Sequence, residues 1–241
     1  HKLIGLVFAI CAAPLFGSIW LYYAAGETKR VEDAVVAVKN DQVLIERVNQ
    51  AVYAAVMETR GIYMSKDWET ARPYANGLQA TVKSLAETVS LIEASSSIVT
   101  AAEKADLKKR TSEFTELRTN QLKIGRERGI AEARLLGDND ANRDNRKAFN
   151  DTIKGISDRL GKLAVAYQAR AEELQARLQT ALVVVGLVPL LGMLAGMLLV
   201  SNGISKPIGR MRASIVGMAH GDLSTAVYGC ERADELGDIG K

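Results

Sequence analysis

The residues best suited to chemistry are arginines, amides and a hydroxyl that fall on or beside the apolar faces of the charged middle section. They are Thr59, Arg60, Gln121, Arg128, Asn142 and Arg146. A guanidinium that faces inward needs an anion or a dense set of hydrogen bonds, because burying it unpaired is costly. These residue types therefore indicate a binding site for a small anion, of which a carboxylate is the simplest.

The alternative for the same arginines is a surface role. Acidic residues lie beside them in the sequence, namely Glu58, Glu132 and Asp144. The arginines would then pair with these neighbours or cap the ends of helices. The sequence leaves both interpretations open.

Catalysis finds no support in the sequence. The two histidines, His1 and His220, are far apart in the sequence, and so are the two cysteines, Cys11 and Cys230. We find no cluster at metal-ligand spacing, no glycine-rich phosphate loop and no nucleophile motif. The expectation is a protein that is not an enzyme and that holds neither a metal nor a cofactor.

Two apolar blocks, residues 3–25 and 181–200, enclose the charged middle section. About twenty apolar residues span a bilayer core as a helix, so both blocks are predicted to be membrane spans. The aromatic residues Trp20, Tyr22 and Tyr23 suit a membrane–water boundary. A buried helix of a soluble domain, or a cleaved signal peptide for the first block, is the competing interpretation. The net charge of +3 does not call for nucleic acid.

The middle section carries four stripes of apolar residues at three- and four-residue spacing. They cover residues 31–62, 71–92, 107–135 and 149–178. Such stripes indicate amphipathic helices, and four joined by short polar loops predict an antiparallel four-helix bundle. Thr100 with Glu103 forms a capping-box pattern before the third helix. The third stripe consists of Leu107, Phe114, Leu117, Ile124, Ala131 and Leu135.

One acidic residue interrupts this pattern. Asp41 falls on the first apolar stripe. Because the period of a helix drifts against a strict heptad, we expect Asp41 to turn outward and Gln42 to take its place.

The segment after the second apolar block has an ordered set of motifs. SKPIGRM begins at Ser205, GDLS at Gly221 and DELG at Asp234. Pro207 suits a helix start and Gly221 a helix end, and the seam residues between them suit a coiled coil. The set closely resembles a HAMP linker. The residues that match its signal-relay positions are Pro207, Gly221, Leu223, Val227, Glu235 and Gly237.

The whole arrangement resembles the front half of a methyl-accepting chemotaxis protein with a four-helix sensing domain. The stretch VMETRGIYMS, residues 56–65, also resembles a segment of such receptors. The chain ends at Lys241, before the methylation helices and the kinase-control tip of that family. A sensor histidine kinase has the same front half and remains the alternative. A structural membrane coiled coil that senses nothing is the third possibility.

The resemblance implies an all-α, multi-pass protein of the bacterial inner membrane. Its expected parts are a first membrane helix (1–25), a periplasmic four-helix sensing domain (26–179), a second membrane helix (180–201) and a HAMP linker (202–241) that is truncated in its second helix. The implied partners are a second copy, higher receptor arrays, and a histidine kinase with its adaptor. The stimulus would be a small ligand such as a carboxylate, or a periplasmic binding protein.

Overall fold

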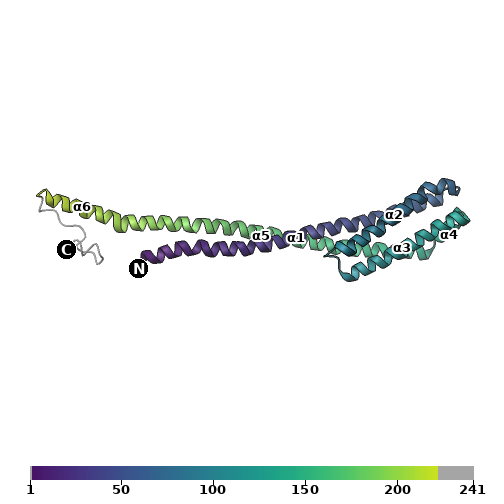
Figure 1. The fold of residues 1–241 in the computed structure, drawn as a ribbon, viewed down its shortest axis with the longest axis horizontal. Coiled ribbons are helices and arrows are strands. Elements are labelled where there is room, and N and C mark those ends of the chain that lie inside the picture. Colours follow the sequence, from purple (N-terminus) through teal and green to yellow (C-terminus); the bar gives the residue numbers. More distant parts are fainter. Residues whose placement is uncertain (1, 222–241) are drawn as a thin grey trace. The chain divides into compact units, whose positions relative to one another are not determined.

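The computed structural model describes residues 2–221, with backbone alone for residues 2–11 and 13. No strand occurs within residues 2–221, so the all-α prediction is confirmed for this part of the chain. Figure 1 shows the helices in chain order. They are α1 (Lys2–Met64), α2 (Trp68–Ser95), α3 (Ala101–Arg128), α4 (Ile130–Gly137), α5 (Asp140–Val200), the π-helical turn η1 (Ser201–Ser205) and α6 (Lys206–Ala219).

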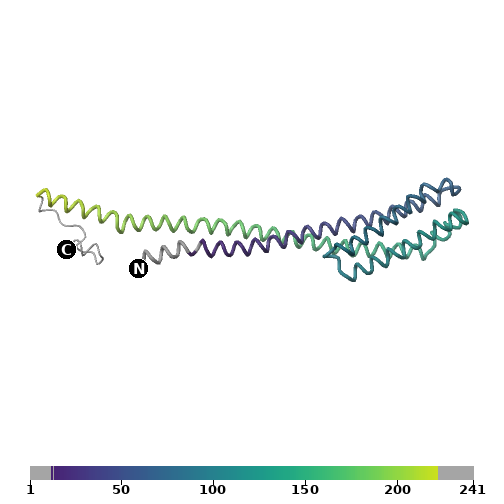
Figure 2. The backbone as a smooth tube through the Cα atoms, viewed as in Figure 1, coloured from purple at the N-terminus to yellow at the C-terminus, as the bar shows by residue number. Residues whose placement is uncertain are grey.

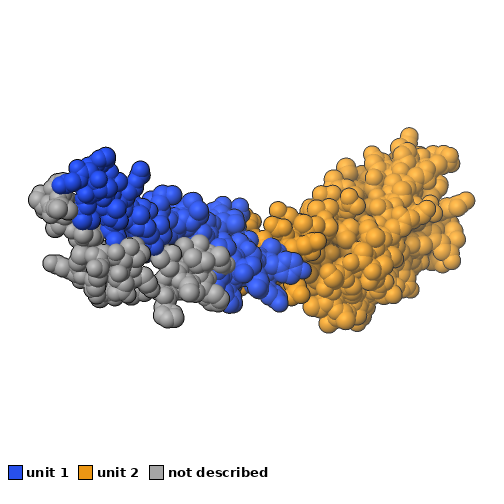
Figure 3. Space-filling view, turned by 60° about the vertical axis from the view of Figure 1, so that its left-hand side comes forward, with its two compact units in different colours: residues 1–27, 174–241 blue, residues 28–173 orange. Residues whose placement is uncertain are grey.

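The chain divides into two compact units, coloured separately in Figure 3. Unit 2 is Thr28–Glu173 and contains most of α1, all of α2, α3 and α4, and the first part of α5. Unit 1 contains His1–Glu27 and Leu174–Lys241. The apolar segment of α5 therefore belongs to unit 1, and the charged middle section forms unit 2.

In unit 2 the long helices run antiparallel to their neighbours in sequence (Figure 1). Side-chain contacts between residues far apart in sequence fix these directions. They join Asp41 to Ser96, Glu93 to Lys108 and Glu103 to Arg159. The segments share one apolar core to which α1, α2, α3 and α5 all contribute.

The second apolar stripe is buried as the sequence predicts, and the first is buried from Val38 to Ile62, whereas Val31 and Ala34 are only half-buried. All seven apolar positions of the second stripe lie in the core, from Ala71 to Ile92. The carboxylate of Asp67 accepts a hydrogen bond from the Thr70 N–H at 2.9 Å, which caps the start of α2. Val38 to Ile62 supply the α1 side of the core. The three- to four-residue spacing determined which face of each helix is buried.

Asp41 does not turn outward, so that prediction is wrong. Its side chain is 4% exposed. The Ser96 hydroxyl donates to the Asp41 carboxylate at 2.5 Å and accepts from the N–H of Val99 at 2.9 Å. Asp41 therefore ties α1 to the turn after α2, and this hydrogen bond offsets the cost of its burial.

The third predicted helix is also partly wrong. Its capping box is confirmed, because the Glu103 carboxylate accepts from the Thr100 N–H at 2.8 Å and the Glu103 N–H donates to the Thr100 hydroxyl at 3.3 Å. Leu107 and Phe114 are buried. The continuation through Ala131 and Leu135 fails, since both are exposed. The helix stops at Arg128 and restarts as α4, which changes the face that points inward.

Gly129 causes this break. Its φ of +98° lies in a region that L residues with a side chain rarely adopt. We expect Gly129→Ala to destabilise the bundle by about 1–3 kcal/mol, although no atom lies within 4 Å of the added Cβ. Gly155→Ala is the matched control, because Gly155 is an exposed helical glycine with equally open surroundings. This control should be neutral or stabilising in chemical denaturation. Equal effects at both sites would contradict the assigned backbone conformation.

Glu103 and Arg159 form a polar link of two hydrogen bonds between α3 and α5. The Arg159 Nε donates to the Glu103 carboxylate at 2.6 Å, and a second Arg159 nitrogen donates to its other oxygen at 2.5 Å. Burial would raise the pKa of Glu103, but the hydrogen bonds from Arg159 and Thr100 together outweigh burial. They hold the pKa below its ordinary value of 4.5.

We therefore expect this link to make the bundle acid-sensitive. A carboxyl whose pKa is lower in the folded than in the unfolded chain stabilises the fold above the unfolded pKa. That stabilisation is lost as the pH falls through the folded-state pKa. Thermal unfolding between about pH 7 and pH 3 should show a smaller loss of Tm for Glu103→Gln than for the natural chain. Glu87→Gln, on the exposed face of α2, should follow the natural chain. Identical pH profiles for all three proteins would refute the assignment.

Unit 1 contains the apolar part of α5, which Figure 2 traces as a continuous helix. Among the described residues, only the helical run Asp140–Ala219 is both long and apolar enough to cross a membrane, and none of its apolar window is buried. The α1 segment of this unit approaches α5 closely. A Cβ added to Gly17 would lie 2.5 Å from the side chain of Val185. Membrane passage of α1 stays a prediction.

The α6 end of unit 1 contains the first two of the six predicted relay residues. Pro207 lies in the first turn of α6, where a missing N–H is tolerated. Gly221 follows the helix with a φ of +95°, as a glycine that ends a helix does. The other four, Leu223, Val227, Glu235 and Gly237, lie outside the described residues.

Candidate functional site

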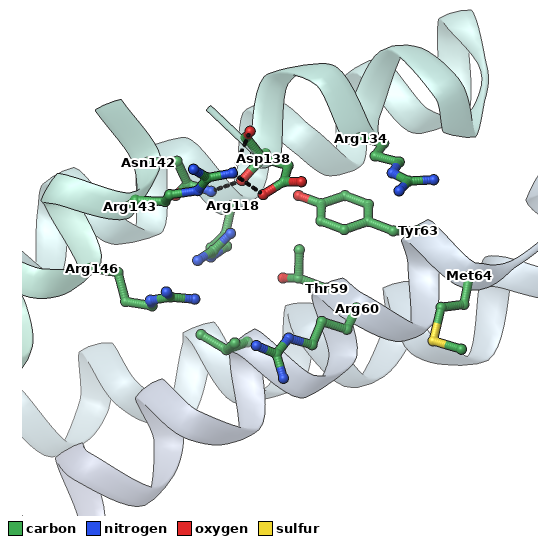
Figure 4. Close-up of a pocket in the computed structure, with 12 residues that line it drawn as sticks. Thr59, Arg60, Tyr63, Met64, Arg118, Arg134, Asp138, Asn142, Arg143 and Arg146 are labelled. Atoms are coloured by element: carbon green, nitrogen blue, oxygen red, sulfur yellow. Dashed lines mark hydrogen bonds and ion pairs between the residues drawn. The ribbon is translucent and has the colours of Figure 1, made fainter. Parts of the chain in front are cut away.

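A cavity of about 650 Å³ lies in unit 2, between α1, α3 and the α4–α5 connection (Figure 4). It forms where Gly129 and the turn at Asp138 redirect the chain, so that α3, α4 and α5 meet the end of α1. The lining residues are Val56, Thr59, Arg60, Tyr63, Met64, Arg118, Arg134, Gly137, Asp138, Asn142, Arg143 and Arg146. Cavities of this size are typical of small-molecule sites.

The lining is strongly cationic. It contains five arginines and a single carboxylate, Asp138. Arg143 donates to Asp138 at 3.0 Å, so this carboxylate already has a partner. Among the described residues, the other four arginines make no ion pair. The cavity consequently has a surplus of positive charge.

Arg118 is the least exposed of these arginines, with 2% of its surface accessible. One of its terminal nitrogens donates to the Gln121 side-chain oxygen at 2.9 Å, and the guanidinium carbon lies 4.7 Å from the centre of the Phe114 ring. Its Nε has no hydrogen-bond partner. The ring and the amide compensate only part of the desolvation of a full charge.

Burial lowers the pKa of the Arg118 guanidinium. The Tyr63 hydroxyl acts in the opposite sense, and the positive charge of Arg146 lowers the pKa further. An arginine stays protonated even so, because its ordinary pKa is above 12. The site therefore contains a permanent positive charge in a poorly hydrated place, with a second arginine close enough to repel it.

Several polar atoms around Arg118 are buried without a partner. They are the Tyr63 hydroxyl, the Gln121 Nε2 and the Asn142 Oδ1. Burial raises the pKa of Tyr63 to about 12, so its hydroxyl is a protonated donor at neutral pH. A Cβ on Gly137 would overlap both the Tyr63 hydroxyl and the Gln121 Nε2. These two donors therefore converge at Gly137, where the absence of a side chain gives them room.

Of the six residues that the sequence predicted for an anion site, four line the cavity. They are Thr59, Arg60, Asn142 and Arg146. Gln121 lies directly behind it, since it is buried and accepts from Arg118. Arg128 is exposed at the end of α3 and does not line the cavity.

Sequence reasoning missed Arg118, which is the most buried charged residue of the site. The signal was present in the spacing. The buried residues of α3 are Leu107, Thr111, Phe114, Arg118, Gln121 and Gly125, which repeat every three or four positions. The prediction instead continued along Leu117 and Ile124, because these are the apolar residues nearby. Arg118, which has the spacing of the buried residues, was left out of the predicted core face, and Leu117 beside it was included instead.

The chemistry available in the cavity is binding through charge and hydrogen bonds. Within the part of the chain that the structure describes, no group of three or more histidine, cysteine, aspartate or glutamate side chains could hold a metal ion. Guanidinium groups, a phenol and amides are instead the donors that recognise oxyanions.

No family model, no curated protein and no solved structure matches this chain.

Proposed function

We propose that the chain is the input half of a transmembrane chemoreceptor. Unit 2 would be its periplasmic sensing domain, and α5 would carry the signal across the inner membrane to a cytoplasmic HAMP linker. One observation carries the proposal. The single helix α5 contains both Asn142 and Arg146, which line the cavity, and the exposed apolar segment that is long enough to cross a bilayer.

The exposed apolar surface supports the membrane part of this proposal. Large side chains along α5, such as Leu191 and Met197, are 63% and 72% exposed. A helix that is apolar on all sides needs an apolar surrounding, and for about twenty residues that surrounding is lipid. A second membrane helix would come from α1. Tyr22 and Tyr23 are exposed at the end of its apolar stretch, as boundary aromatics are.

The segment after α5 supports the linker. Pro207 and Gly221 have the backbone positions that a HAMP helix needs at its two ends. Ile208 and Ile215 are about half exposed, at 48% and 52%. Apolar residues at this spacing form a seam with other helices, so a homodimer is the proposed assembly.

The proposed mechanism is a small movement of α5. A ligand in the cavity would shift α5 against α1 and α3, and the shift would pass along the helix to Pro207. Helix displacements of about 1–2 Å are sufficient for such switches. The ligand must bind the two signalling states with different affinity, because only that difference moves the equilibrium.

Joining residues 1–241 to the kinase-control module of a characterised chemoreceptor tests this proposal. Pro207→Ala or Glu235→Ala should lock kinase output in one state and change ligand affinity by no more than the coupling energy, about 1–3 kcal/mol. Arg126→Ala, on the exposed face of α3, should leave output unchanged. Normal signalling by both linker variants would contradict the proposal. The coding sequence beyond Lys241 separates the chemoreceptor from the alternative, a sensor histidine kinase.

A further inference from the structure

The buried positive charge of Arg118 has no negatively charged partner among the described residues. The Arg118 guanidinium, with 2% exposure, lies over the Phe114 ring and donates to the Gln121 amide oxygen, and neither group carries a negative charge. Natural proteins that bury a charge pair it or bind an ion, because an uncompensated buried charge costs several kcal/mol. The nearest carboxylate in the cavity lining is Asp138, and Arg143 already occupies it.

Arg146 adds a second positive charge to the same cavity. It is half-buried, it lines the same cavity and it makes no ion pair among the described residues. Figure 4 shows the Arg146 and Arg118 side chains extending toward the same space from α5 and α3. Arg60 and Arg134 are exposed, so water and salt screen their charges. Two poorly screened positive charges therefore remain.

The unpartnered polar atoms indicate what completes the site. The Tyr63 hydroxyl is an unpartnered donor in the cavity lining beside Arg118, and the Gln121 Nε2 is a second unpartnered donor directly behind that lining. Donors of this kind, with a guanidinium fork, match the lone pairs of carboxylate or phosphate oxygens. The free acceptor, Asn142 Oδ1, would accept from a hydroxyl of the same ligand.

A bare inorganic ion would fill only a small part of the cavity. Its volume is about 650 Å³, whereas one water takes up roughly 30 Å³. Part of the wall is apolar, formed by Val56, Met64 and the ring of Tyr63. A ligand with a short carbon body would cover these side chains while its charged ends meet the arginines.

We propose that this cavity binds a small organic dianion, with Arg118 as the buried anchor for one negative group and Arg146 as the partner of the other. The site lies within one chain, between α1, α3 and α5. The inference rests on the proposed function only in naming the dianion as the stimulus. The binding chemistry itself depends on the cavity alone.

Binding should be measured on the full chain in lipid nanodiscs, by thermal shift and calorimetry. The probes are succinate and glycerol 3-phosphate as dianions, monomethyl succinate as the matched monoanion, and inorganic phosphate as the ion without a carbon body. We expect one of the two organic dianions to raise Tm by an amount that grows with the logarithm of its concentration above Kd. The monoanion and inorganic phosphate should bind at least tenfold more weakly. The stronger of the two dianions identifies the charged group as carboxylate or phosphate.

Substitutions locate the site. Arg118→Met should abolish the shift while leaving the Tm of the ligand-free protein unchanged or higher, because it removes an uncompensated buried charge. Arg146→Gln, at the more accessible position, should weaken binding at least tenfold and covers the case in which Arg118→Met does not fold. Arg128→Met is the control, since Arg128 is on the same helix outside the cavity.

Three results would overturn the inference. They are no shift with either dianion, equal binding to the Arg118→Met protein, or an equal loss in the Arg128→Met control. If neither dianion shifted the Tm and Arg118→Met lowered the Tm of the ligand-free protein, Arg118 would have a structural partner instead of a ligand. None of these outcomes bears on the passage of α5 through the membrane, which the linker variants and the labelling experiment described below test separately.

Discussion

Replacing Leu191 and Leu194 together by arginine is expected to prevent α5 from inserting into the membrane. Both side chains lie in the middle of the apolar segment and are more than half exposed, at 63% and 56%. The ten leucines and valines that remain between Leu182 and Val200 in this variant favour insertion by about 3–6 kcal/mol, at roughly 0.3–0.6 each. Two arginines near the centre oppose it by about 5–7 kcal/mol. The net free energy of inserting α5 into the membrane therefore becomes unfavourable or close to zero.

The measurement is the side of the membrane from which a single cysteine at Arg212, exposed on α6, is labelled, because α1 would keep the protein in the membrane even if α5 did not insert. The Leu191→Ala/Leu194→Ala protein is the control, because it shortens the same side chains without adding charge. An impermeant maleimide should reach Arg212→Cys from the periplasmic side in the arginine protein and only from the cytoplasmic side in the control. If the two proteins were labelled alike, α5 would not be in contact with lipid at these positions.

Phe114→Ala is expected to have the largest effect on the stability of unit 2. The Phe114 side chain is fully buried, stacks edge-on against Phe149 at 5.6 Å between ring centres, and lies beneath the Arg118 guanidinium. Removing such a ring costs about 3–5 kcal/mol, through lost burial and the cavity that remains. Because a domain is stable by only about 5–15 kcal/mol, much of the fold's stability would be lost.

Chemical denaturation of the single and double variants at these two rings measures the effect. The Phe114→Ala/Phe149→Ala protein should be less destabilised than the sum of the single variants, by about 0.5–1.5 kcal/mol for the ring–ring contact. Phe114→Leu should recover most of the loss, since it refills the volume. Additive effects of the two truncations would show that the rings do not support each other.

The three- to four-residue spacing of apolar residues predicted the buried faces of α1 and α2, because this spacing alone largely determines which face of an amphipathic helix is buried. In α2, every apolar residue at three- or four-residue spacing from Ala71 to Ile92 is buried, and no polar residue competes for that face. The rule failed where backbone conformation decides instead. Nothing in the spacing after Leu117 indicates that Gly129 adopts a positive φ and divides the helix. A glycine inside a charged helix tolerates either conformation, so tertiary contacts determine the outcome.

The candidate site was predictable in part for a related reason. Thr59, Asn142 and Arg146 lie where the predicted faces turn polar, so their placement follows from helix geometry. Arg118 was missed because hydrophobic patterning assumes that charged residues avoid the core. Asp41 was misplaced because helical drift was expected to turn it outward, whereas its hydrogen bond with Ser96 lies inside the bundle. A charged side chain at a buried helix position needs partners that compensate its charge. These partners can lie far away in the sequence, so the local pattern does not show whether the charge is buried.

The central claim is that α5 crosses the membrane and leaves the bundle and α6 on opposite sides. Single cysteines at Lys83, exposed on α2, and at Arg212, exposed on α6, test it most directly once Cys11 and Cys230 are serine. In cells whose outer membrane alone is permeable, an impermeant maleimide should label Lys83→Cys at once. It should label Arg212→Cys only after the inner membrane is opened. Labelling of both positions from the same side would contradict the account.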